Sequence, residues 1–342
     1  MERPYILHMF TPGRQMSPFD INMAADAGYQ LIVPYADVGI DAIRGLTQDT
    51  IFSRGPKGVA RTGIFIGGRD ALLAADMLEQ ARAAMVKPFV VSLMADPSGA
   101  YTTAAAMLAC VEAALRRGGA SGLAGQRIVI LGGTGPVGRI AGVIAAQAGA
   151  EVLLSSRNGI DVAEAAARET GQRFGVTLHG VSGGDPAALR ASIGEADVLL
   201  ACAAAGVQVV SAEALAHAKR LKVAADVNAV PPEGIAGVGV MDDAKPIAGT
   251  AALGIGALAV GNVKYQTQHR LLLRMHDAER AVVLGHAEAF EVAREFVAEK
   301  AAGKAAEKAA GNVAEPAAET TADQAAGESS GEPTAAPGVK PA

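Results

Sequence analysis

Residues 127–138 read RIVILGGTGPVG, and this stretch decides the fold class. Residues 127–131 are almost wholly Ile, Val and Leu without alternation, which is typical of a strand buried on both faces of a parallel sheet. Gly133, Gly135 and Gly138 follow in the GxGxxG spacing of dinucleotide-binding turns. In that motif two glycines permit a tight turn and close approach to a pyrophosphate, and the third lets the following helix pack on the strand.

The residues between these glycines fit the same interpretation. Thr134, Pro136 and Val137 complete the turn, and Pro136 stands where the first helical turn has free N–H groups in any case. Those N–H groups and the helix dipole favour an anion. A helix over residues 137–148 and an apolar strand over residues 151–155 should follow. We therefore predict a Rossmann-type domain, the alternative being a glycine-rich turn in an unrelated α/β domain.

The end of the second strand indicates which dinucleotide is bound. NAD sites usually carry Asp or Glu there, about 20 residues after the first glycine. This chain has Ser155, Ser156 and Arg157 instead. Two hydroxyls and a guanidinium suit a 2′-phosphate, so NADP is the predicted cofactor, and NAD stays acceptable because no carboxylate repels it. The alternative for Arg157 is an exposed strand-end arginine without a ligand.

Composition excludes several classes of protein. The 342-residue chain is long enough for two domains, and its formal charge of -5 argues against nucleic acid as the main partner. Cys110, Cys202 and the six histidines show no disulfide framework and no metal-ligand spacing, so no metal is expected. We expect no signal peptide at the N-terminus, and we expect the uncharged run 246–263 not to span a membrane because it is rich in glycine. A cytoplasmic protein without membrane contact is therefore expected.

Strands and helices also alternate in the first hundred residues. We predict strands over residues 5–10, 30–35, 62–66 and 89–94, with helices beginning at Ser17, at Asp70 and near Thr102. This pattern predicts a mainly parallel sheet whose ligands gather at the carboxyl ends of the strands, beside a cleft between two domains. The residues expected at that edge are Thr11, Arg14, Tyr35, Asp37, Arg69 and the run Asp96 to Thr103, which includes Ser98 and Thr102.

Three of the candidate residues have plainer alternatives. Asp20 suits a capping box that begins at Ser17. Asp96, which precedes Pro97, suits a turn. Phe19 suits a hydrophobic core.

The second half of the chain continues the pattern. Strands are predicted over residues 197–201 and 222–227. The small residues from Ala203 to Gly206 leave room for a nicotinamide ring, and Asn228 ends the next strand. Ala203, Gly206 and Asn228 are therefore further candidates for cofactor binding.

Seven segments together resemble the NAD(P)-dependent methylene-tetrahydromethanopterin dehydrogenases of methylotrophic bacteria, which are relatives of the methylene-tetrahydrofolate dehydrogenases. The resemblance covers residues 4–300 in order. The segments are SPFDINMAADAGY, TIFSRG, TGIFIGGRD, PFVVSLMADPSGAYTTAAAM, LGGTGPVGR, DVNAVPPEGIAG and AALGIGALAVGNVK.

This resemblance implies an activity and an organisation. The activity is hydride transfer from methylene-tetrahydromethanopterin to NAD(P)+ in formaldehyde oxidation, which gives the methenyl form. The organisation is a pterin domain over residues 1–104, a Rossmann domain over 105–264, closing helices over 265–300 that return to the first domain, and a homotrimer or hexamer. Composition alone predicts a disordered tail over residues 301–342.

The resemblance also implies roles for particular residues. Asp20, Asp96 and Lys264 are the candidates for catalysis, Lys264 being our assignment for the family's active-site lysine in a loop 256–269 that is longer than in the shorter relatives. Phe19 and Tyr35 would pack on the pterin. The basic residues that would receive the carrier's acidic tail are Arg14, Arg54 and Arg69. Two other functions stay open, which are a tetrahydrofolate-specific enzyme and an NADP-sensing module without hydride transfer.

Overall fold

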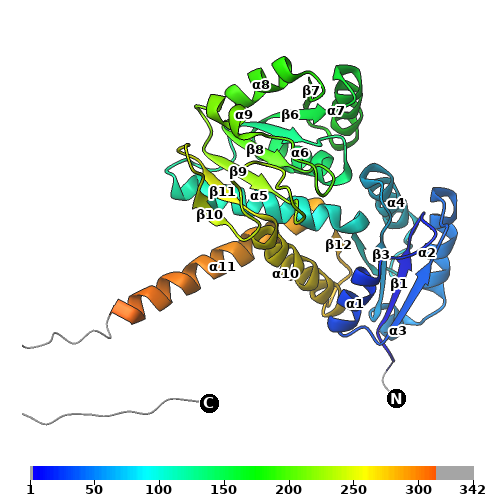
Figure 1. The fold of residues 1–342 in the computed structure, drawn as a ribbon. Helices are drawn as coiled ribbons and strands as arrows, with labels where there is room; N and C mark the ends of the chain where they lie inside the picture. The colour runs from blue at the N-terminus through cyan, green and yellow to red at the C-terminus, as the bar shows by residue number, and fades with distance from the viewer. Residues whose placement is uncertain (1–2, 313–342) are drawn as a thin grey trace, which may run out of the picture. The chain divides into compact units, whose positions relative to one another are not determined.

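The computed structural model describes residues 3–312. Contacts group the chain into one compact unit that ends at Ala301 and a second that begins at Ala302. Within the described residues, the strands form two sheets of five and seven strands with helices between them, which confirms the predicted α/β class (Figure 1). The helix expected to end near Lys300 continues to Asn312 as α11 (His286–Asn312), and the rest of the predicted tail lies outside the described residues.

The first sheet, here called the N-terminal sheet, has the strand order β12-β4-β3-β1-β2, and each of its pairings is parallel. Its central strands β1 and β3 supply the core residues Leu7, Met9, Ile64 and Phe65. Its strands are β1 (Ile6–Phe10), β2 (Leu31–Tyr35), β3 (Thr62–Ile66), β4 (Ser92–Ala95) and β12 (Val283–Leu284). Its helical elements are α1 (Pro18–Asp26), η1 (Ile40–Ala42), α2 (Ile43–Phe52), α3 (Pro56–Val59), α4 (Ala71–Ala84) and η2 (Pro97–Gly99).

The second sheet, here called the Rossmann sheet, has the order β10-β11-β9-β8-β5-β6-β7. Counted from β5, its parallel strands follow the order 3-2-1-4-5-6 of dinucleotide-binding domains, and β10 pairs antiparallel with β11 at one edge. Its strands are β5 (Arg127–Leu131), β6 (Glu151–Ser156), β7 (His179–Ser182), β8 (Val198–Ala201), β9 (Val223–Asp226), β10 (Asp243–Pro246) and β11 (Leu253–Ile255). Its helices are α6 (Pro136–Gln147), α7 (Ile160–Phe174), α8 (Pro186–Gly194) and α9 (Ala212–His217).

Two long helices connect the sheets. α5 (Ala100–Arg117) follows η2 and packs against α6, β9 and α10, and α10 (Ala257–His276) also packs against α1 and β4 (Figure 1). The segment 256–269, predicted as a loop with a helix starting only at residue 265, is therefore helical. No described helix is both long and apolar enough to cross a membrane.

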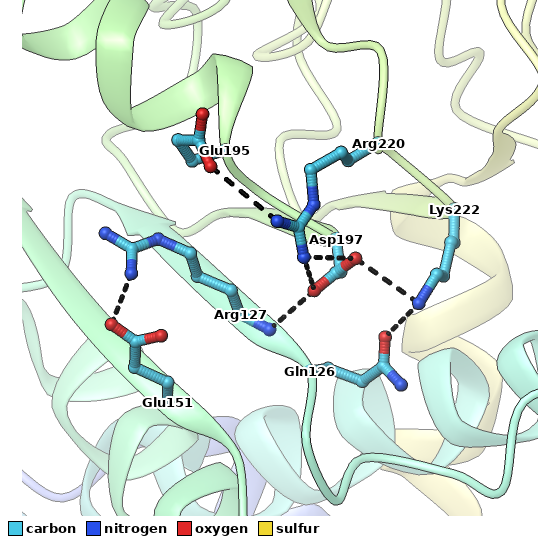
Figure 2. A network of polar contacts seen from close by, with 7 residues as sticks. All are labelled: Gln126, Arg127, Glu151, Glu195, Asp197, Arg220 and Lys222. Atoms are coloured by element: carbon cyan, nitrogen blue, oxygen red, sulfur yellow. Dashed lines mark hydrogen bonds and ion pairs between the residues drawn. The ribbon is translucent and has the colours of Figure 1, made fainter.

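A polar network ties the amino ends of three strands of the Rossmann sheet together (Figure 2). The buried Asp197 accepts a hydrogen bond of 2.9 Å from the Arg127 backbone N–H and pairs with Arg220 and Lys222 at 3.3 Å. Lys222 also donates to Gln126 at 2.8 Å. Burial opposes ionisation of Asp197, but these donors and cations outweigh it and lower the pKa of the carboxyl. The network therefore stabilises the end of the sheet opposite the glycine-rich turn.

Candidate functional site

A cavity of about 660 Å³ opens at the carboxyl edge of the N-terminal sheet. In this sheet β1 pairs with both β2 and β3, so the strand order reverses at β1 and β3. Parallel sheets bind ligands at such a switch point, because the loops after the two strands diverge to opposite faces. The lining comes from residues 11–13 and 15–20 after β1, 68–70 after β3, Ser98 and Gly99 after β4, and Lys264 from α10.

A chain of polar side chains crosses the base of this cavity. Lys264 donates from Nζ to Gln268 Oε1 at 2.5 Å, and Gln268 donates from Nε2 to Asp20 Oδ1 at 2.7 Å. Gln268 is fully buried and Asp20 is 3% exposed. Because one amide oxygen faces the ammonium and the amide nitrogen faces the carboxylate, both ends of the chain hold Gln268 in one orientation.

The sequence pattern did not lead us to predict a role for Gln268. The residue lies one helical turn after Lys264, and residues four apart share a face of a helix. The available signal was the spacing Lys-x-x-x-Gln, but placing the helix start at residue 265 left Lys264 outside the helix. Only with α10 beginning at Ala257 do the two side chains point the same way.

Phe19 and Lys264 lie against each other in the lining of the cavity. Lys264 Nζ lies 3.7 Å from the centroid of the Phe19 ring, a cation–π contact. Phe19 is 44% exposed, so the core role left open for it is wrong. Gly99 has a φ of 68°, and a Cβ on it would lie 3.0 Å from Lys264 Cε. The glycine therefore leaves the space that the lysine occupies.

Burial perturbs the ionisable groups of the site. Burial raises the pKa of Asp20 to about 6, and the nearby Asp96 adds to this rise while Gln268 and Lys264 oppose it. Burial also lowers the pKa of the Lys264 ammonium, against the opposing charges of Asp96 and Asp20. Two carboxyls and one amine therefore form a single electrostatic cluster, as is common at functional sites.

The local contacts of Asp20 bear on its alternative role in a capping box. Ser17 precedes α1, but its side chain makes no capping hydrogen bond. The Asp20 carboxylate accepts from Gln268 of α10 instead. Tertiary contact, rather than local capping, accounts for this carboxylate.

Asp96 lies beneath the cavity and does not line it. Its Oδ1 accepts from the backbone N–H groups of Tyr101 and Thr102 at 2.9 and 3.1 Å, and its Oδ2 accepts from Thr102 Oγ1 at 2.6 Å. The carboxylate thus caps the first turn of α5. Asp96 is fully buried, and burial raises the pKa of its carboxyl while Lys264 opposes the rise. The carboxylate of Asp96 interacts electrostatically with Lys264, which does line the cavity.

The remaining substrate candidates separate into two groups. Ser98 and Arg69 line the cavity, and Ser98 donates to the Gly68 carbonyl at 2.8 Å. Arg14, Tyr35 and Thr102 do not line it: Arg14 is exposed, Tyr35 contacts His8 Nδ1 at 3.1 Å, and Thr102 is fully buried.

Arg54 lies at the other edge of the sheet. It donates to the Pro4 carbonyl at 3.1 Å and to Thr62 Oγ1 at 2.8 Å, at the amino ends of β1 and β3. The structure therefore does not bring Arg54 to the cavity.

The glycine-rich turn between β5 and α6 has the space that a bound pyrophosphate requires. A Cβ on Gly133 would lie 2.8 Å from the Leu154 backbone, and one on Gly138 would lie 2.7 Å from the Gly132 carbonyl. A Cβ on Gly135 would meet only the Gly132 carbonyl, at an ordinary 3.4 Å. Protein packing therefore accounts for Gly133 and Gly138, whereas Gly135 faces open space in front of α6, as close approach of a phosphate would require.

The remaining cofactor candidates surround this turn. Thr134, Pro136 and Val137 form the turn and the first residues of α6, and Thr134 accepts from Arg139 Nε at 3.1 Å through its carbonyl. At the end of β6, Ser155 and Ser156 are buried and Arg157 is exposed. The exposed guanidinium of Arg157 suits a phosphate, whereas the two serine side chains are largely shielded from solvent.

The loop after β8 contributes backbone more than side chains. A Cβ on Gly132 would lie 2.7 Å from the Ala203 backbone, so the β5 and β8 loops touch. Asn228 Oδ1 accepts from the Gly206 and Val230 N–H groups, each at 3.0 Å. Asn228, which follows β9, therefore ties the β8 loop to the β9 loop.

The fold and the glycine-rich turn define a dinucleotide-binding protein of the Rossmann type, with a cavity at the carboxyl edge of the N-terminal sheet. The family model described as "Methylene-tetrahydromethanopterin dehydrogenase, N-terminal" matches residues 18–98. The NAD(P)-dependent methylenetetrahydromethanopterin dehydrogenase of Methylorubrum extorquens is 48% identical over 290 residues, covering 85% of this chain and 98% of that protein. The chain therefore belongs to the methylene-tetrahydromethanopterin dehydrogenase family, as the resemblance predicted.

Two further matches are more distant than this relative. The "Bifunctional protein MdtA" of the same organism is 32% identical over 85% of this chain and 98% of its own length. Among solved structures, shikimate 5-dehydrogenase from Listeria monocytogenes covers 86% of this chain and 96% of its own, with a TM-score of 0.45 and 13% identity. That structural likeness is too low to indicate a function.

Proposed function

We propose that this chain oxidises methylene-tetrahydromethanopterin to the methenyl form with NAD(P)+ as hydride acceptor. The observation that carries this proposal is the hydrogen-bonded chain Asp20–Gln268–Lys264 beside the exposed ring of Phe19, at a cavity at the switch point of the N-terminal sheet. The 48% identity to an NAD(P)-dependent methylenetetrahydromethanopterin dehydrogenase supports the choice of substrate and cofactor.

The reaction asks for positioning and charge rather than for a strong acid or base. The methylene carbon loses a hydride, and the lone pairs of its two flanking nitrogens spread the resulting positive charge. Bound NAD(P)+ supplies the carbon that accepts the hydride. The protein then has to hold the two reactants in register and to stabilise a cation, which are the tasks of a preorganised site.

The cavity residues suit these tasks. Phe19 offers an exposed ring on which a flat pterin can stack, and Lys264 beside it can donate to a pterin acceptor. A lysine charge alone would oppose a forming cation. Asp20 and Asp96 offset that charge, so the cluster carries a net negative charge when both carboxyls are ionised.

We propose NADP as the preferred cofactor, with NAD also accepted. Its pyrophosphate would lie over Gly135 at the start of α6, and its 2′-phosphate beside Ser155, Ser156 and Arg157. Arg157 is exposed at the strand end, where a planar guanidinium can bind a phosphate through two hydrogen bonds. The small residues after β8 would then face the nicotinamide.

We also propose that the two sheets divide the work, the pterin domain over residues 1–104 and the Rossmann domain over 105–264. The helices over 265–300 then close the first domain. Two observations support this division. The boundary falls in α5, which leads from one sheet to the other, and the chain returns to β4 as β12.

Kinetics with each cofactor and each carrier would test the function. NADP+ or NAD+ would be mixed with methylene-tetrahydromethanopterin or methylene-tetrahydrofolate, and growth of the reduced-nicotinamide absorbance would be followed. We expect turnover with the methanopterin and a loss of turnover, but not of NADP binding, in Lys264→Met. Turnover with methylene-tetrahydrofolate but not with methylene-tetrahydromethanopterin would show that the carrier is tetrahydrofolate. NADP binding without turnover on either carrier would indicate an NADP-sensing protein.

We further propose a cytoplasmic homo-oligomer, either a trimer or a hexamer. Both faces of parallel sheets are usually covered, yet Leu31 and Val33, on one face of the edge strand β2, are 49% and 37% exposed. A second copy of the chain would cover them. Sedimentation of the full chain and of a Leu31→Glu variant would test the assembly, since a monomeric wild type would refute it. Cell fractionation would test the location.

A further inference from the structure

Arg69 lies between the substrate cavity and the glycine-rich turn. It lines the 660 Å³ cavity together with Asp20 and Lys264. It also lines a second cavity of about 270 Å³, in which it faces Thr134 and Pro136 at the start of α6. One side chain of the N-terminal sheet thus borders the expected position of the cofactor's pyrophosphate.

The backbone on either side of Arg69 is fixed. Before it, Gly68 has a φ of 108° and its carbonyl accepts from Ser98 Oγ at 2.8 Å. After it, Asp70 caps α4 by accepting from the Leu72 and Leu73 N–H groups at 2.9 and 3.1 Å. The base of the side chain is therefore held, which reduces the entropy cost of binding a ligand there.

The other charged groups around the second cavity are already engaged. Arg139 pairs with Glu169 at 2.8 Å, and the Asp70 carboxylate caps its helix. Arg69 itself is exposed, and among the described residues it makes no hydrogen bond or ion pair. It is therefore the cation beside the turn that is available to a ligand, within the part of the chain that the structure describes.

We propose that Arg69 binds the pyrophosphate of the dinucleotide from the substrate side of the cleft. A helix N-terminus supplies only about half a positive charge, whereas the pyrophosphate carries two negative charges. A guanidinium facing the turn would complete this balance with paired hydrogen bonds. This inference rests on the proposed cofactor binding, and it gives Arg69 a different ligand from the acidic carrier tail suggested by the sequence.

The assignment has a functional consequence. Arg69 and Asp70 line both cavities, so a cofactor that binds Arg69 also fixes one wall of the substrate cavity. Bound NADP should then increase the affinity for the pterin, and by thermodynamic reciprocity the pterin should increase the affinity for NADP. Arg69 is in this sense a positioning residue for the reaction.

Binding measurements on the full chain separate this role from others. Titrations with NADP+ and with adenosine 2′-monophosphate, which lacks the pyrophosphate, would compare wild type, Arg69→Met, Arg69→Lys and Arg157→Ala. We expect Arg69→Met to weaken NADP+ by about tenfold or more and to leave adenosine 2′-monophosphate unchanged, with partial recovery in Arg69→Lys. Arg157→Ala should weaken both ligands.

Two results would overturn the inference. One is wild-type NADP+ affinity in Arg69→Met together with a raised KM for the pterin, which would assign Arg69 to the carrier tail. The other is an unchanged affinity for both ligands. Failure of the proposed function would look different, because the wild-type chain itself would then not bind NADP+ or would bind it without turnover. Melting temperatures of the variants would confirm that each still folds.

Discussion

Asp20→Asn should stabilise the protein in neutral solution while impairing its activity. Burial and the neighbouring Asp96 raise the pKa of Asp20 from 3.8 to about 6. Below pH 3.8 the group is protonated in both the folded and the unfolded chain, so it contributes nothing. Between pH 3.8 and about 6 the unfolded chain loses the proton first, so the folded state loses stability as the pH rises.

The size of the effect follows from the pKa values. One pKa unit corresponds to about 1.4 kcal/mol, so above pH 6 the buried charge costs about 3 kcal/mol. Asn keeps the oxygen that accepts from Gln268 and removes the charge. For a compact unit that ends at Ala301, with an unfolding entropy of about 2.1 cal/mol/K per residue, this corresponds to a rise in Tm of about 5 °C at pH 7.5, which shrinks to about 1 °C at pH 4.

Thermal unfolding of both proteins from pH 4 to pH 8 would measure this difference. Asp197→Asn is a matched control of opposite sign, because its pKa is lowered in the folded chain. Its ionised form adds stability that is present above pH 3.8 and is lost as the pH falls through the folded pKa, so this variant should be less stable at neutral pH. A Tm difference for Asp20→Asn that does not depend on pH would refute the reasoning.

The same substitution should change the pH profile of activity. If the ionised Asp20 stabilises the forming cation, wild-type turnover should rise with pH through about 6. In Asp20→Asn, turnover should be lower and this rise should disappear. A retained rise near pH 6 would assign it to another group.

The remaining predictions concern the cofactor turn and Asp96. Gly135→Val should still fold, because only a carbonyl at 3.4 Å lies near its Cβ, but it should abolish NADP binding because the side chain would fill the space proposed for the pyrophosphate. Gly138→Ala should instead lower Tm, because its Cβ would lie 2.7 Å from the Gly132 carbonyl. An NADP titration and a melting curve on each variant would show whether the two effects separate. Arg157→Ala should weaken NADP about tenfold or more and NAD little, as measured by KM for each, and equal effects would remove Arg157 from the 2′-phosphate site. Asp96→Asn can keep the Oδ1 contacts that cap α5 and lose the charge, so turnover should fall with NADP affinity intact; wild-type turnover with a lower Tm would make Asp96 purely structural.

Local signals in the sequence were enough for the elements of the sheets. β3 and β5 were predicted at their observed bounds, because buried parallel strands are short, apolar and bounded by glycine. The glycine-rich turn was equally predictable, because its spacing of glycines has a local cause. A side chain at Gly138 would collide with the Gly132 carbonyl, and one at Gly133 would collide with the backbone of the adjacent strand. Strand alternation also placed Ser98 and Arg69 at the correct edge of the sheet.

Long-range contacts decided the site itself. Gln268 reaches Asp20 across 248 positions of sequence, and no local pattern encodes that distance. Arg54 was predicted to bind the acidic tail of the carrier, but it lies at the amino ends of the strands. That prediction failed because the sequence does not indicate which edge of a sheet a residue outside a strand will face.

The sequence by itself determined the α/β class, the dinucleotide turn and the family, because each depends on residues that are close together or on segments in a fixed order. The tertiary structure decided which charges share one cavity. Burial in the folded chain, not residue type, raises the pKa of Asp20 and lowers that of Lys264. Both shifts require the solvent to be removed by elements from distant parts of the chain, and this happens only when α10 packs against α1.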